Sequence, residues 1–347
     1  MPSKNSPLIL NGTRCMLSQE GELEKMKKTN LFAILTLAAT PAFLHAQTTN
    51  YSSVVGYQTK TVNTGALSVI SIPFADAVVT SQVSAATSNT ITLQGQTALG
   101  SLFNSTDPVY VEITNGSSEG ERFDISLSGI TSATDTLSIN TTGANNTSSF
   151  PGASLVGASV VVRKHTTLNS LKSMFSPALK TGTVSTADLI YIFASGSWTP
   201  YFLNGSSIWS RSGSLANFNN TVIPPGSAVM FKRVDSTSST FTAIGTVRGN
   251  KFAKNYKAGL GVYAPGFPIA YSPSSMGANV AGGWASGDVI YVLSGATFTP
   301  YTFNGTNWKR SGSLANFDTT QLLASDAGIL VKKGTQISVL ETAPTNN

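Results

Sequence analysis

The sequence holds few of the side chains from which catalytic and metal sites are built. Of its 347 residues, one is cysteine, two are histidine and 11 % carry a formal charge. Cys15 and His45 precede residue 47, so the long remainder has a single histidine, His165, and no thiol. This excludes a disulfide framework and the usual zinc sites there. We predict no metal and no cofactor, and we expect His165 to be a partly exposed residue at a strand boundary.

Long apolar runs are also missing, which excludes a membrane-spanning helix in the exported chain. A short apolar run does occur in residues 26–46, MKKTNLFAILTLAATPAFLHA. Two lysines, a short apolar middle and a small residue at Ala46 are typical of a secretory signal peptide, cleaved after Ala46 or Ala42. A buried core helix is the alternative. Residues 1–25 are then interpreted either as a gene start placed too far upstream or as a cytoplasmic tail. The signal peptide predicts a secreted, periplasmic or cell-surface protein.

Positive charge is too sparse and scattered for a nucleic-acid partner. The formal net charge is +6 over the whole chain. The basic residues come as isolated pairs at strand ends rather than on one face, as nucleic-acid binding requires. We expect these pairs to lie in solvent; they are Arg163–Lys164, Lys232–Arg233, Lys309–Arg310 and Lys332–Lys333.

What the sequence has in abundance is the pattern of short β-strands. From Gln47 onward, branched and aromatic residues alternate with Ser and Thr between turn residues, which predicts an all-β sandwich or meander fold. Only one short helix is expected, capped by Thr167 with Leu168, Leu171 and Phe175 on one face. The clearest predicted strands are Val54–Val62, Leu67–Pro73, Thr90–Leu93, Val109–Thr114, Arg122–Leu127, Thr136–Ile139 and Ser159–Arg163.

The second half of the sequence repeats itself. Residues 188–218 and 288–317 align along their length and share the string SGSLANF. Asn-Gly pairs at 204 and 304 favour tight hairpins, so each copy is predicted to be a three-stranded meander. Pro200 and Pro300 fall in the middle strands, which are expected to lie at a sheet edge or to be bulged at the proline. A fainter similarity links 55–74 to 244–268. We therefore predict two related antiparallel β modules. The first comprises residues 51–75 plus 165–243 and is interrupted by an inserted β segment at 80–163. The second comprises residues 244–341, and a tail follows at 342–347.

Paired carboxylates are the remaining route to hydrolytic chemistry. Glu112 and Asp124 fall on the outer face of a predicted hairpin, with Arg122 between them. A glycan hydrolase or lyase could use that pair, but cross-strand ion pairing explains it without catalysis. Asp188 and Asp288 occupy equivalent positions in the repeat and could meet at a module interface. Their plainer role is to hydrogen-bond the turn before the strand.

Repeated aromatic residues give the best indication of a ligand. Exposed aromatic rings could stack on sugar rings, whereas buried ones would fill the cores of the modules. The candidate ligand-binding residues are Trp198, Tyr201 and Trp209 in the first copy and Phe298, Tyr301 and Trp308 in the second.

Several stretches are similar to a family of uncharacterised secreted bacterial proteins that occur as multiple paralogues. These stretches are SVVGYQTKTV, PVYVEITNGSSEGERFDI, VVRKHTTLNSLKSMF, DLIYIF and IPPGSAVMFKR. The resemblance implies export and the same order of modules, and it implies no activity, substrate or site residue.

Together these patterns predict a secreted or envelope-associated, non-enzymatic β protein that acts through surface contacts. Its expected partners are polysaccharide or other surface proteins. The alternatives are a glycan-active hydrolase or lyase with paired carboxylates and a structural component of a surface layer or matrix.

Overall fold

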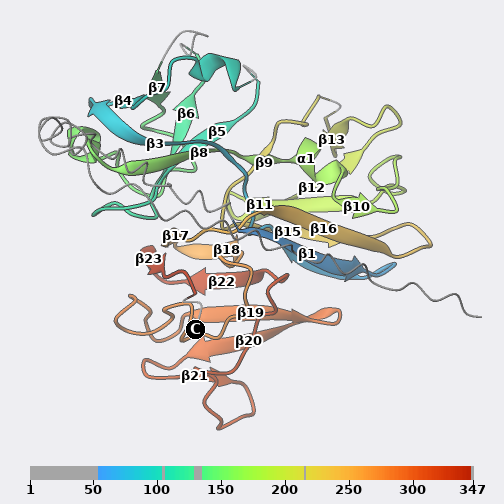
Figure 1. Cartoon of the computed structure of the whole chain (residues 1–347). Helices are drawn as coiled ribbons and strands as arrows, with labels where there is room; N and C mark the ends of the chain where they lie inside the picture. The colour runs from blue at the N-terminus through green and yellow to red at the C-terminus, as the bar shows by residue number, and fades with distance from the viewer. Residues whose placement is uncertain (1–53, 104–105, 129–134, 215, 345–347) are drawn as a thin grey trace, which may run out of the picture. The chain divides into compact units, whose positions relative to one another are not determined.

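The regular secondary structure of the described residues is almost entirely antiparallel β-sheet, with one short α-helix (Figure 1). This confirms the all-β fold class. The computed structural model describes residues 54–103, 106–128, 135–214 and 216–344. The predicted start segment, the signal peptide and the last three residues of the predicted tail lie outside the described residues.

A closed six-stranded barrel occupies the place of the predicted insert. Val109, Val111 and Ile113 alternate into its fully buried interior, as the two-residue period of a strand requires. Two 3-10 turns, η1 (Leu99–Ser101) and η2 (Gly152–Leu155), lie in its loops. In order around the barrel, the strands are β3 (Ala77–Ala86), β4 (Thr90–Leu93), β7 (Thr136–Ile139), β6 (Arg122–Ser126), β5 (Val109–Ile113) and β8 (Ser159–Lys164).

A five-stranded sheet, the first sheet, is built from residues on both sides of the barrel in the sequence. Its order is β13 (Trp209–Arg211), β12 (Ser197–Leu203), β11 (Leu189–Ala194), β15 (Ala228–Lys232) and β2 (Leu67–Ser71). Beside it lies a three-stranded sheet of β1 (Val55–Val62), β16 (Ser239–Thr246) and β10 (Phe175–Ser176). A two-stranded ribbon of β14 (Val222–Ile223) and β9 (Thr166–Thr167) also lies beside it, as does the helix α1 (Leu168–Lys172).

The helix follows its sequence signals closely. The Thr167 hydroxyl accepts from the backbone N–H of Ser170, and the Ser170 hydroxyl accepts from the backbone N–H of Thr167. Leu168 and Leu171 are fully buried, as predicted. The helix ends at Lys172, so Phe175 is buried from strand β10 and not from the helix.

A second five-stranded sheet has the same strand order as the first. The hairpin register is also the same, because Val289 pairs with Thr302 as Leu189 pairs with Phe202. The predicted module boundary at residue 244 falls inside β16, which pairs with β1 over its whole length. The strands are β21 (Trp308–Arg310), β20 (Thr297–Phe303), β19 (Val289–Ser294), β22 (Ile329–Lys333) and β18 (Gly259–Tyr263), with β17 (Phe252–Tyr256) and β23 (Ile337–Glu341) as a two-stranded ribbon.

The two sheets meet through matching contacts. The backbone N–H of Ser71 donates to Asp326 (3.2 Å) and that of Ala264 donates to Gly226 (2.8 Å). In the shared strand order Ser71 corresponds to Ala264 and Gly226 to Asp326, so the contacts are related as in a two-fold interface. A small buried apolar cluster fills the interface: Val69, Ala228, Val262, Ala264 and Leu330.

Candidate functional site

Four of the six candidate aromatic residues lie in the hydrophobic cores. Tyr201 and Trp209 pack in the core of the first sheet, and Tyr301 and Trp308 in that of the second. Trp209 and Trp308 are 1 % and 0 % exposed. Of the two alternatives that the sequence leaves open, these four rings follow the one in which they fill the cores of the modules, because the hydrophobic effect favours burying such large apolar surfaces.

The other two candidates lie elsewhere. Trp198 and Phe298 are half-buried, and both pack against the interface cluster between the two sheets. Three further half-buried apolar residues, Phe193, Tyr291 and Leu293, pack against the same cluster. We call these five residues the twin-hairpin cluster, because they come from the β11–β12 and β19–β20 hairpins. Sequence reasoning missed the last three, although they lie opposite or diagonal to the predicted rings in a regular hairpin.

The shape of each hairpin places these side chains near its tip. Phe193 pairs with Trp198, and Leu293 pairs with Phe298, directly across the strands. The rings of Phe193 and Trp198 lie 5.1 Å apart in an edge-to-face arrangement. The tips at 194–197 and 294–297 are exposed.

The prolines behave as predicted. Strand β13 pairs only with Tyr201–Leu203, so the half of β12 that holds Pro200 lies at the sheet edge. Pro300 is placed in the same way beside β21, which pairs with Tyr301–Phe303. No ladder hydrogen bond is lost at either proline, and both hairpins can project beyond the sheet.

Glu112 is not on a solvent-exposed surface, contrary to the sequence prediction. It points away from the barrel interior but is 0 % exposed. Its carboxylate accepts from Arg163 Nε (2.8 Å), Arg248 Nε (3.1 Å) and Asn250 Nδ2 (2.9 Å). Burial alone would raise the pKa of Glu112, but the guanidinium groups of Arg248, Arg163 and Arg122 outweigh it and lower this pKa to about 2. The predicted partner Arg122 lies opposite Glu112 but donates to backbone carbonyls of Gly120 and Ala253.

His165 is buried rather than partly exposed. Its Nε2 lies 2.9 Å from Asp124 Oδ1, and its ring lies 4.6 Å from that of Tyr110. Asp124 also accepts from Asn145 Nδ2. This contact joins strand β6 to the residue between β8 and β9. The other ring nitrogen, Nδ1, is buried and has no hydrogen-bond partner among the described residues, so no nucleophile completes a triad with His165 there.

Asp188 and Asp288 do not meet at a module interface. Each is 2 % exposed and pairs with a cation from its own sheet, Arg233 for Asp188 and Lys333 for Asp288. Each also accepts from a backbone N–H of the preceding turn, of Lys180 or Ala285, as predicted. The basic pairs are consequently not all in solvent: Arg163, Arg233 and Lys333 are buried beside carboxylates.

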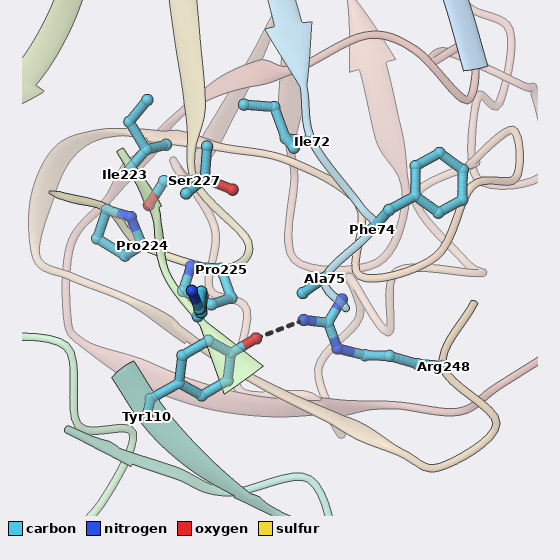
Figure 2. A pocket seen from close by; sticks show the side chains of 11 residues that line it. Ile72, Phe74, Ala75, Tyr110, Ile223, Pro224, Pro225, Ser227 and Arg248 are labelled. Carbon is cyan, nitrogen blue, oxygen red and sulfur yellow. Dashed lines mark hydrogen bonds between the residues drawn. The ribbon is translucent and has the colours of Figure 1, made fainter. Parts of the chain in front are cut away.

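Two hollows among the described residues differ in size and lining. One lies between the barrel and the first sheet, where Tyr110 and Arg248 are joined by a hydrogen bond near Pro224 and Pro225 (Figure 2). It encloses about 10 Å³, which is room for roughly one water molecule. A shallow hollow of about 250 Å³ on the barrel is lined by 115–118 and 154–158 and contains no ionisable side chain.

Within the described ranges, no group of three or more His, Cys, Asp or Glu residues could hold a metal ion. No helix in that part of the chain is long and apolar enough to cross a membrane. No protein-family model, curated protein or solved structure matches the chain.

Proposed function

We propose that the protein is an exported, non-enzymatic β protein that binds polysaccharide through the twin-hairpin cluster. The observation that carries this proposal is the gathering of half-buried side chains, most of them aromatic, from two equivalent hairpins against one buried cluster. The signal-like residues 26–46 support export to the periplasm, the cell surface or the medium. The similar sequences and matching strand orders of the two sheets support duplication of one ancestral unit.

Aromatic side chains suit this task because each offers a rigid apolar face. The C–H faces of sugar rings are apolar, so stacking on such a face removes apolar area from water while the sugar hydroxyls stay hydrated. Trp198 and Phe298 are half-buried, so each is held by packing and keeps part of its surface accessible. The five side chains of the cluster thus combine a fixed position with some accessible apolar surface.

The competing hydrolase or lyase hypothesis has little support from its own candidate residues. A glycosidase needs an accessible acid with a raised pKa beside a second carboxylate. Glu112 has its pKa lowered to about 2 and no exposed surface. Asp188 and Asp288 are each buried in a separate ion pair.

A structural role in a surface layer or matrix has one observation in its favour. Strand β1 lies at the edge of its sheet, with Val55 and Tyr57 exposed beside Ile244. Exposed apolar edge strands can pair with other chains. This role predicts concentration-dependent self-assembly of the purified protein in light scattering, and a constant monomer mass would exclude it.

A glycan array followed by affinity measurements tests the proposed binding. We expect the double variant Trp198→Ala/Phe298→Ala to lose retention on the glycans that retain the wild type, with little change in melting temperature. Tyr57→Ala, an exposed aromatic residue outside the cluster, is the matched control and should bind normally. Unchanged retention of the double variant would show that the cluster is not the binding site.

A further inference from the structure

The twin-hairpin cluster comes from two hairpins that carry no charged side chain. Residues 189–203 and 289–303 contain no Asp, Glu, Lys, Arg or His. The aspartates that precede the two hairpins, Asp188 and Asp288, are buried and neutralised by Arg233 and Lys333. The hairpin tips therefore present aromatic rings, backbone amides and hydroxyl groups without a free charge of their own.

Charged ligands would need a different surface. Uronate or sulfate groups of acidic polysaccharides are recognised by lysine and arginine through charge-assisted hydrogen bonds. The cations on the strands of this sheet face are Lys232, Lys332 and Lys309. They pair with Leu189, Val289 and Thr302, at the other end of the hairpin strands from the tips. The chemistry of the tips thus suits an uncharged sugar chain.

The two hairpins offer the same chemistry twice. Phe193 and Trp198 occupy the positions of Leu293 and Phe298 in the equivalent hairpin. Both pairs pack against one interface cluster, so the two contact surfaces adjoin the same buried residues. A polymer of repeated units could contact both, and the second contact would then be intramolecular and strengthen binding without any new type of contact.

We propose that the ligand is a neutral polysaccharide whose chain contacts both hairpins at once. This inference rests on the proposed function and specifies the ligand class and the binding mode. It predicts that affinity rises with chain length until both hairpins are engaged. It also predicts that binding depends little on salt, because screening weakens charge–charge attraction and leaves apolar stacking in place.

The test is calorimetry with soluble glucans and mannans of increasing length, and with polygalacturonate as the acidic probe. For the long neutral chains, Trp198→Ala or Phe298→Ala alone should each lower affinity by about 100-fold, toward the affinity of a short oligosaccharide. Tyr57→Ala should leave it unchanged, and far-UV circular dichroism would show that each variant is folded.

The outcomes separate the inference from the proposed function. Equal affinity for short and long neutral chains would overturn binding across both hairpins. Binding of polygalacturonate alone, weakened by added salt, would overturn the neutral ligand while polysaccharide binding stood. Binding of no glycan by a folded wild type would overturn the proposed function itself.

Discussion

At the scale of single residues, Glu112 shows how a charged side chain can be retained inside the protein. Its ordinary pKa of 4.5 is lowered to about 2. Between these values the unfolded chain binds a proton that the folded chain does not, so stability rises with pH. The contribution is complete above about pH 4.5 and is lost as pH falls through about 2. The shift corresponds to roughly 3 kcal/mol.

We predict that Glu112→Gln destabilises the protein by roughly 3–5 kcal/mol at neutral pH, because it leaves buried guanidinium groups without their anion. The variant should also lose part of the acid dependence of stability. Urea unfolding of both proteins at neutral and acidic pH measures this. Glu121→Gln is the control, since Glu121 forms no ion pair with another described residue. Parallel acid dependence in wild type and Glu112→Gln would contradict the role given to Glu112.

The aromatic residues of the repeat divide into two classes by burial. Trp209→Ala and Trp308→Ala should each lower the free energy of unfolding by roughly 3–5 kcal/mol, because each leaves a large cavity in a core. Trp198→Ala should cost clearly less, since Trp198 is only partly buried. Denaturant unfolding of the three variants checks this, and equal losses would place Trp198 in a core as well.

At the scale of strands and sheets, Gly328 controls how closely the two sheets approach. A Cβ atom at Gly328 would lie 2.3 Å from Cβ of Ala228 and 2.7 Å from Val69. We predict that Gly328→Ala costs about 1–3 kcal/mol through this overlap, and that adding Ala228→Gly restores part of the loss. Gly205→Ala is the matched control, because a Cβ there meets nothing within 4 Å. An unchanged free energy of unfolding in Gly328→Ala would show that the two sheets do not approach each other closely at Gly328 and Ala228.

Many of the strands and hairpins could be predicted from the sequence. Alternating side chains and Asn-Gly turns located the hairpins, and strands β4 and β7 have the predicted bounds. Strand β3 was not predicted, because its mixed polar sequence lacks clear alternation. Burial of Glu112 was also beyond prediction. Strand periodicity shows that it points out of the barrel, but its cover comes from Arg248, 136 residues away in the chain.

At the scale of the whole molecule, a few polar contacts tie the barrel to the rest of the chain. Arg248 bridges Glu112 and Tyr110 of the barrel and the backbone of Pro73. Arg122 donates to the backbone of Ala253 at 2.7 Å. All these groups are buried or part-buried, so each hydrogen bond is formed away from competing water, and losing one partner leaves the other unsatisfied.

We predict that this network makes the barrel and the two sheets unfold together, and that Arg248→Met separates them. All four tryptophans lie outside the barrel, at 198, 209, 284 and 308, so tryptophan fluorescence follows the sheets while far-UV circular dichroism follows every strand. In the wild type the two urea transitions should coincide, as cooperative unfolding requires. In Arg248→Met the dichroism transition should broaden and part from the fluorescence transition.

Lys164→Met is the control for that experiment. Its ion pair with Asp107 also involves the barrel, but the two side chains are 51 % and 35 % exposed. Such exposed pairs contribute about 0–1 kcal/mol, so coincident transitions should persist in this variant. If the two probes still coincide in Arg248→Met, cooperativity must come from other contacts, such as the cation–π contact of the Arg122 guanidinium with the ring of Phe252, and the hydrogen bonds of Arg248 would be a minor link.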